Sequence, residues 1–331
     1  MRLALGVGAL IAFLATPYAI RRRLLATRSP LVLGTFAALS LFGIAASTIA
    51  VLGIIVAPEP LPVTALGGVI DACVVGLSRL LSHPLRHWPS MLAAAILVAL
   101  GARLVIAIVR TAKDARRAIP SRHLIPGEVD AGPLFGRAIQ GVRVLPCAAP
   151  VAYTTGFLRP QTVLSSGLLR ALGERERLAV VAHERGHANR SHVTLLFVGA
   201  VVGRAFWFVP GVRLAVGYLV LALEMAADDD AVRALGNPVE VAGAIAAAAR
   251  LGTHAPTLGV GVTGSDVALR VHRLLHSVHP RWPLRAGAVA AVALAAMTML
   301  AVAWSSASGA ITRERAALAQ HEVCHLPHPP I

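Results

Sequence analysis

The sequence predicts an integral membrane protein that is mainly α-helical, with four transmembrane helices and a polar α+β domain between the third and the fourth. Hydrophobic residues make up 56% of the 331 residues, charged residues only 14%, and the mean hydropathy is +0.70. The apolar residues gather in long uncharged runs, and the middle third of the chain is polar enough to fold in water. These observations exclude an ordinary soluble two-domain protein.

The charge and cysteine content exclude two further classes of protein. A net charge of +15 would suggest nucleic acid as a partner of a soluble chain. Membrane proteins, however, retain arginine on the cytoplasmic side of their spans, and no basic, aromatic-interleaved stripe is found here. We therefore expect no direct nucleic acid binding. Cys73, Cys147 and Cys324 are too widely separated for a disulfide scaffold or a metal-type cysteine pair.

Arginine clusters orient the four predicted spans. Residues 3–20 form the first span and precede Arg21–Arg23, an order opposite to that of a cleavable signal peptide. Residues 31–57 return the chain to the outside. Residues 91–109 and 286–304 form the third and fourth spans, each with about the 19 residues that a hydrocarbon core of roughly 30 Å requires. The basic residues place the N-terminus outside the plasma membrane and the central domain in the cytoplasm.

This map defines the predicted domains. In the outer loop, the stretch 63–82 carries Asp71 and Arg79 on one helical face, which favours an amphipathic helix on the outer membrane surface over a fifth span. The predicted domains are residues 1–109 with three helices and the outer loop 58–90, the cytoplasmic domain 110–285 including an apolar hairpin 193–223, the fourth helix 286–304, and a short extracytoplasmic tail 305–331.

A five-residue motif in the cytoplasmic domain points to metal chemistry. In His183-Glu184-Arg185-Gly186-His187, the two histidines lie one helical turn apart, so both imidazoles can bind one metal ion. Glu184 would lie beside the open position of that ion and act as the general base of peptide hydrolysis. The acidic residues that open the segment at Glu174 and its apolar face favour a helix. Two surface histidines on an ordinary helix are the alternative.

Glu224 is the predicted third zinc ligand, with His183 and His187. It follows a strictly apolar run in which an unpaired carboxylate would be costly, and a metal ion would compensate its charge. Asp228, one turn later on the same face, can accept a hydrogen bond from the far nitrogen of a ligating histidine. Asp229 and Asp230 point elsewhere and are predicted to lie on a solvated helix surface.

The apolar stretch 193–223 separates His187 from Glu224. Because both side chains must reach one ion, this stretch crosses the membrane twice or not at all. Pro210-Gly211 marks a turn between two limbs that are short for full spans. We expect a hairpin that packs on the domain and dips into the membrane surface, with the aromatic residues 206–208 near its tip. The alternative is that these aromatic residues belong to the core.

Two further features surround the motif. His192 has neither the spacing nor the intervening glycine of the third histidine in the metzincin pattern, so it is predicted not to be a zinc ligand, and a polar role near the substrate cleft is the alternative. Three short strands are predicted at Gly141–Pro146, Tyr153–Leu158 and Thr162–Ser165. An edge strand of their sheet would bind an extended peptide by backbone hydrogen bonds.

Together these segments resemble the BlaR/MecR-type antirepressor metallopeptidases, which are integral membrane gluzincins. The resemblance runs through Thr155–Pro160, Val163–Leu168, the histidine motif and Glu224 to Asp228. It implies a gluzincin-type zinc protease domain, zinc held by His183, His187 and Glu224, and Glu184 as the catalytic residue. It also implies regulatory cleavage near the inner membrane face, typically of a winged-helix repressor.

The chain also departs from that family. Antibiotic-sensing members carry a penicillin-binding sensor domain after the last span, and we expect none after Trp304. His192 stands where family members often have an aspartate. The expected activity is a membrane-bound zinc endopeptidase that cleaves a cytoplasmic repressor. A quality-control protease of the HtpX and CAAX-protease type is one alternative. A non-catalytic adaptor with a structural metal site is another, although structural zinc does not need Glu184.

A second copy of the pattern occurs in His321-Glu322-Val323-Cys324-His325. The predicted topology places it on the opposite side of the membrane from Glu224, and the prolines that follow it leave little helix to hold His325 in register. We expect a flexible tail. The alternative is a weak transition-metal site formed by His321, Cys324, His325 and His328.

Overall fold

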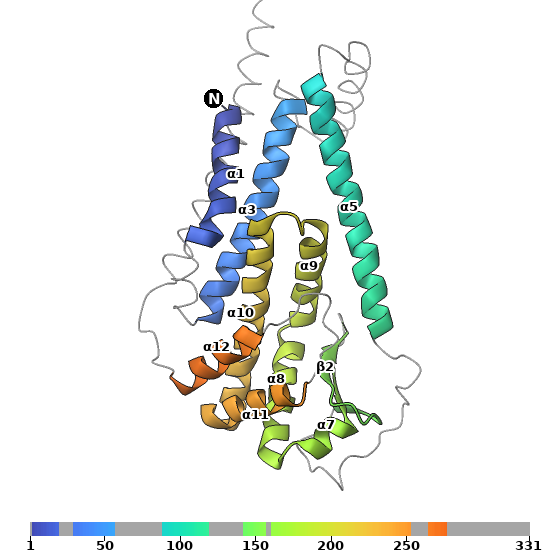
Figure 1. Ribbon diagram of the computed structural model, residues 1–331, viewed down its shortest axis with the longest axis vertical. Coiled ribbons are helices and arrows are strands. Elements are labelled where there is room, and N and C mark those ends of the chain that lie inside the picture. The colour runs from blue at the N-terminus through green and yellow to red at the C-terminus, as the bar shows by residue number, and fades with distance from the viewer. Residues whose placement is uncertain are drawn as a thin grey trace, which may run out of the picture. The chain divides into compact units, whose positions relative to one another are not determined.

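The computed structural model describes residues 2–19, 29–56, 88–118, 142–156, 160–252 and 264–276 (Figure 1). The predicted surface helix 63–82, the fourth span 286–304 and the second motif at 321–325 lie outside these residues. The chain divides into two compact units, which are described separately. The described part of the first unit is 2–13, 42–56 and 88–101, and that of the second is 14–19, 29–41, 102–118, 142–156, 160–252 and 264–276.

Three long apolar helices occupy the positions of the first three predicted spans: α1 (Arg2–Ala19), α3 (Pro30–Val56) and α5 (Trp88–Ala118). Pro30–Ile49 of α3 and Trp88–Arg116 of α5 are long and apolar enough to cross a membrane, whereas Gly6–Ala19 of α1 is a shorter apolar helix. Large apolar side chains on these helices are exposed, as for Val98 at 73%. Exposed apolar faces of this length suit contact with lipid.

The apolar stretch 193–223 forms the predicted hairpin. Its limbs are α9 (His192–Ala205) and α10 (Pro210–Leu235), and the turn between them exposes Trp207 and Phe208 by 61% and 50%. The expectation that both limbs are too short to span is wrong for α10. This helix continues past the apolar run until Gly236 ends it in the left-handed conformation, with φ 75°. At 26 residues, α10 is a third candidate membrane span.

Arg103, the charged residue within the third predicted span, belongs to the second unit, and so do the residues it contacts. Its Nε donates a hydrogen bond to the carbonyl oxygen of Ala205 at 3.0 Å, and its guanidinium lies 5.1 Å from the ring centroid of Phe208. The carbonyl belongs to the last residue of α9, where helix carbonyls lack intrahelical partners. A charge in an apolar helix is thus compensated by a helix end and an aromatic face.

A three-stranded sheet precedes the helical part of the domain. Its strands β1 (Val142–Leu145), β2 (Ala152–Thr155) and β3 (Gln161–Ser165) lie in the order β1-β3-β2, with β1 parallel and β2 antiparallel to β3. The three predicted strands are therefore confirmed within the described residues. The central strand carries Val163 and Leu164, which are 1% and 0% exposed. β2 is an edge strand of this sheet.

Two helices follow the sheet, α7 (Ser166–Ala171) and α8 (Glu174–Asn189). Ser165 caps α7, since its Oγ accepts a hydrogen bond from the backbone N–H of Leu168 at 3.1 Å. At the start of α8, the backbone N–H of Gly173 donates to the carboxylate of Glu176 at 2.9 Å. Acidic residues in this first turn also favour the positive end of the helix dipole. The helix predicted around the histidine motif is therefore confirmed.

Packing on two sides fixes the rotation of α8 about its axis. Val181 belongs to a core cluster with Leu164 and Leu168 of the sheet layer. Ala179 belongs to another cluster, formed with α10, with α11 (Pro238–Arg250) and, through Leu274, with α12 (Gly264–Leu275). Because both clusters exclude water, a turn of α8 about its axis would expose apolar side chains. The direction of its histidine face is thereby set.

Gly167 tests the packing of α7 under the sheet. A Cβ at this position would overlap the backbone carbonyl group of Ala148. We expect Gly167→Ala to lower the free energy of unfolding by about 1–3 kcal/mol. Gly243 of α11 is the matched control, because a Cβ there meets nothing within 4 Å, and Gly243→Ala should be neutral or stabilising by up to about 1 kcal/mol. Thermal unfolding measures both changes, and equal effects would contradict this packing.

Candidate metal centre

One face of α8 carries His183, Glu184 and His187. The Nε2 atoms of the two histidines lie 3.2 Å apart, as their spacing of one helical turn predicts. The residues Glu184 and His187 are 8% and 6% exposed. Two imidazoles and a carboxylate are thus held together with little access to water, an environment in which a polar group needs a partner.

Glu224 of α10 completes this group. Its carboxylate oxygens lie 3.5 Å from Nε2 of His183 and 3.5 Å from Nε2 of His187. One ligand-type atom from each of the three residues lies within 4.8 Å of the others. The structure therefore brings together the three residues predicted as ligands. Two imidazole nitrogens and a carboxylate oxygen facing one point form the donor set of a common type of zinc site.

Gly186 allows α8 to approach α10 closely enough for these contacts. A Cβ at Gly186 would lie 3.1 Å from Cα of Ala227 and 3.1 Å from Cβ of Asp230. Any larger residue would therefore push the two helices apart. The glycine inside the histidine motif is a packing requirement that positions Glu224.

The Nδ1 atom of each histidine, on the side of the ring away from Glu224, has a polar neighbour. Nδ1 of His183 lies 3.0 Å from Oδ1 of Asp228, which is 0% exposed, so the position predicted for Asp228 agrees with the structure. Nδ1 of His187 lies 3.0 Å from Nδ1 of His192. His192 is 3% exposed. It is packed behind His187, because α9 begins at His192 directly after a tight turn.

Arg270 of α12 is a charged residue of the site that the sequence patterns do not indicate. Its guanidinium donates to both carboxylate oxygens of Asp228 at 2.8 and 2.7 Å, and its Nη1 lies 2.8 Å from Oε2 of Glu224. It is 6% exposed. No local pattern distinguishes Arg270 from the other basic residues of the chain, since its partners lie more than forty positions away in sequence.

The next two aspartates of α10 also have arginine partners. Asp229 accepts from Arg273 at 2.6 Å. Asp230 accepts from Nε and Nη2 of Arg190 at 2.6 and 2.9 Å, and also pairs with Arg233. The Asp230 side chain is only 17% exposed, so the expectation that it lies on a solvated surface is wrong. Its neighbours explain this, because Gly186 leaves Asp230 packed against α8.

Thr154 links the edge strand to the candidate base. Its Oγ1 lies 2.8 Å from Oε2 of Glu184 and 2.8 Å from the backbone carbonyl oxygen of the same residue. Thr154 thereby orients the Glu184 carboxyl and ties β2 to α8. Thr154 lies in a predicted strand, but no sequence pattern indicates its role, because the contact between β2 and α8 is a tertiary contact.

Burial and the two α10 carboxylates shift the pKa values of the α8 groups. Burial raises the pKa of the Glu184 carboxyl. Burial also lowers the pKa of His187 to about 4, which keeps its imidazole neutral. For His183, burial opposes protonation, but the hydrogen bonds and charges of Asp228 and Glu224 outweigh it and raise the pKa to about 10. The carboxylates of Asp228, which is buried, and of Glu224, whose side chain is 16% exposed, therefore face two cationic groups, His183 and Arg270.

A model of the BlaR1 peptidase M56 family matches residues 148–241 of this chain. The matched segment starts before β2 and ends in α11, so it contains both the α8 motif and the α10 carboxylates. No curated protein and no solved structure matches the chain. Over this segment the chain is similar to a family of peptidases whose members are typically zinc-dependent.

A substitution of Arg270 tests whether its charge is needed to compensate the carboxylates of Asp228 and Glu224. Arg270→Met leaves buried Asp228 and Glu224 with one cation fewer, so we expect the free energy of unfolding of chelator-treated protein to fall by about 3–5 kcal/mol. Arg175→Met is the matched control, because Arg175 pairs with Glu240 on the surface with 79% of its side chain exposed, and should cost less than about 1 kcal/mol. Denaturant unfolding compares the two, and similar losses would contradict the buried role of Arg270.

Proposed function

We propose that this protein is a membrane-bound zinc endopeptidase that cleaves a cytoplasmic transcriptional repressor. The observation that carries the proposal is the convergence of His183, His187 and Glu224 beside the buried carboxyl of Glu184. The match of this segment to a peptidase family supports it, and so do the candidate membrane spans.

The donor set fits zinc. His183, His187 and Glu224 would hold the ion, with Asp228 and His192 fixing the histidine rings from behind. Bound there, zinc would act as a Lewis acid that polarises the peptide carbonyl and lowers the pKa of a water molecule toward about 7. Glu184, which is not a ligand in this arrangement, distinguishes a catalytic site from a structural one.

Glu184 would carry the proton transfers of hydrolysis. In this proposal its carboxylate accepts a proton from the water whose oxygen attacks the peptide carbonyl carbon, and it donates the proton to the amine nitrogen as the C–N bond breaks. Burial favours this exchange, since it raises the pKa of Glu184. Thr154 holds one carboxyl oxygen at 2.8 Å, so the group keeps one orientation through both steps.

The outer edge of β2 is the proposed binding surface for the substrate. An extended peptide can pair with an edge strand through backbone hydrogen bonds, which tolerates many side chains. Because Thr154 of β2 contacts Glu184 directly, a peptide on this edge would pass beside the candidate base. This supports cleavage of an extended, locally unfolded segment of the repressor.

The zinc assignment predicts that substitutions of the base and of a ligand affect zinc content and peptide hydrolysis differently. Purified protein should hold one zinc per chain. Glu184→Gln should retain it and lose peptide hydrolysis, since the base is gone while the ligands remain. Glu224→Ala should lower zinc content because a ligand is gone. Metal analysis and cleavage of a fluorogenic peptide measure the two properties.

Glu174→Gln is the matched control for these variants, because Glu174 lies in the exposed first turn of the same helix and should change neither property. Full zinc occupancy in Glu224→Ala would exclude Glu224 as the third ligand. Mapping new protein N-termini in cells with active and Glu184→Gln protein then identifies the substrate. Cleavage of many misfolded membrane proteins would replace the repressor proposal with a quality-control role.

The proposed cytoplasmic position of the site predicts reporter outcomes. The arginine distribution places the region after α5 inside the cell. A reporter that needs the cytoplasm should therefore be active when fused after Asp130 and silent when fused after Ser308. The opposite pair of outcomes would place the metal site outside the cell and rule out cleavage of a cytoplasmic repressor.

A further inference from the structure

A groove runs between α3 and α10 within the second unit. Its volume is about 570 Å³, within the range of about 300–1,000 Å³ that small-molecule pockets occupy. One wall is a stripe of α3 that includes Leu31, Gly34 and Ala38, and the floor is a stripe of α10 that includes Leu219 and Ala226. The lining along most of its length is apolar. Leu31 and Leu195 on its rim are 63% and 44% exposed.

The groove has a defined direction. Phe36 lies beside Tyr218, with ring centroids 6.3 Å apart, and Gly34 lies beside Ala222. Residue numbers fall along α3 as they rise along α10, so the two helices are antiparallel. The Pro30 end of α3 therefore lies toward the C-terminal end of α10, where the apolar stripe ends at Asp229 and Arg233.

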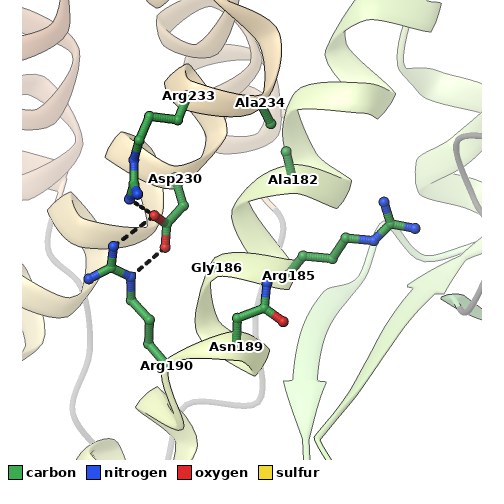
Figure 2. A pocket seen from close by; sticks show the side chains of 8 residues that line it. All are labelled: Ala182, Arg185, Gly186, Asn189, Arg190, Asp230, Arg233 and Ala234. Carbon is green, nitrogen blue, oxygen red and sulfur yellow. Dashed lines mark hydrogen bonds and ion pairs between the residues drawn. The ribbon is translucent and has the colours of Figure 1, made fainter.

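The polar end of the groove is lined by Arg190, Arg233 and Asp229, and Asp229 is paired with Arg273. Arg190 and Arg233 also line an adjoining cavity of about 540 Å³ that Arg185 extends (Figure 2). Figure 2 shows the two guanidinium groups sharing a single carboxylate, that of Asp230. The adjoining cavity is thus lined by three arginines and one aspartate. The Arg190 and Arg233 side chains are 45% and 63% exposed, so an incoming anion can reach them.

This cavity is separate from the metal centre. None of the residues that line it is a proposed zinc ligand, and its α8 residues Ala182, Gly186 and Asn189 lie roughly 170° around the helix from Glu184 and about 90° from His183. A ligand there would not contact the proposed zinc ligands. We therefore expect the groove to bind a ligand other than the peptide that would be cleaved at the proposed zinc site.

We propose that the groove binds an anionic phospholipid, with one acyl chain along the apolar stripe of α3 and α10 and the phosphate headgroup at Arg190 and Arg233. Both walls belong to candidate membrane spans, which puts the apolar part at acyl-chain depth. In the sequence, Arg28 and the cluster Arg21–Arg23 precede α3, which favours the cytoplasmic headgroup level for the charged end.

The composition of the groove favours a lipid over a peptide. A peptide in the apolar part would bury backbone N–H and C=O groups against aliphatic side chains, without hydrogen-bond partners. An acyl chain has no such groups, and its phosphate accepts the charge-assisted hydrogen bonds that arginine donates in pairs. Four arginines (Arg185, Arg190, Arg233, Arg273) face two aspartates (Asp229, Asp230) at this end, and the resulting net positive charge selects an anionic headgroup over a zwitterionic one. This inference does not depend on the peptidase proposal.

The test compares two lipids on the full-length protein. Native mass spectrometry measures apparent Kd values for phosphatidylglycerol and phosphatidylcholine with identical acyl chains. We expect tighter binding of phosphatidylglycerol. Arg233→Gln, which leaves Asp230 paired with Arg190, should weaken phosphatidylglycerol binding about fivefold, and Arg190→Gln/Arg233→Gln roughly 25-fold, at about fivefold per arginine. Phosphatidylcholine binding should not change.

Two further variants complete the design. Arg143→Gln/Arg170→Gln removes the same charge from exposed positions outside the groove and should leave both Kd values unchanged. Ala38→Phe, at an exposed position of the groove wall, should weaken both lipids. Unaltered thermal unfolding shows that each variant is folded.

Three outcomes would overturn the proposal. Equal affinity of the wild-type protein for the two lipids would exclude headgroup selection. An unchanged Kd in the double arginine variant would exclude the charged end of the groove. Displacement of phosphatidylglycerol by a soluble poly-glutamate peptide, together with unchanged binding in Ala38→Phe, would identify an acidic peptide as the occupant instead.

Discussion

Two carboxylates of one helix, α10, determine the arrangement around the candidate metal centre. Glu224 and Asp228 follow the apolar run of α10; Asp228 is 0% exposed and the Glu224 side chain only 16%, so water solvates neither fully. Unpaired buried charges are strongly destabilising, so each carboxylate needs a cation or a hydrogen-bond donor. Arg270 contacts both of them, and His183 of α8 lies between them. The contacts of α8 and α12 with α10 are therefore electrostatic requirements as well as hydrophobic packing.

The same charge balance prepares the site for a metal ion. The protonation of His183 and the charge of Arg270 together match the two carboxylates. A divalent cation held by His183, His187 and Glu224 would require neutral histidines, so His183 would give up its proton. The Glu184 carboxylate, once ionised, would balance the added positive charge, so the cation would also favour the deprotonated base.

α10 carries both the candidate metal ligand Glu224 and a candidate membrane span. The apolar part of this helix belongs to a candidate span, and its last turns carry Glu224, Asp228 and Asp230. Asp230, on another side of α10, pairs with Arg190 and Arg233 at the charged end of the lipid groove. Gly186 of α8 packs against Ala227 and Asp230, so the histidine motif lies one helix away from that groove. One rigid helix therefore sets the depth of the proposed active site relative to the proposed lipid headgroup.

Much of this site follows from local sequence patterns, while its supporting contacts do not. The spacing of His183 and His187, the carboxylate of Glu224 after an apolar run, the position of Asp228 one turn later, the three strands and the hairpin were all predicted, because each depends on the period of a helix or strand or on the cost of an unpaired charge. The length of α10 was underestimated, because the end of the apolar run is not the end of the helix. His192, Arg270 and Thr154 acquired their roles only in the tertiary structure. Their partners belong to other elements, and no local pattern encodes which distant side chain will lie within 3 Å of another.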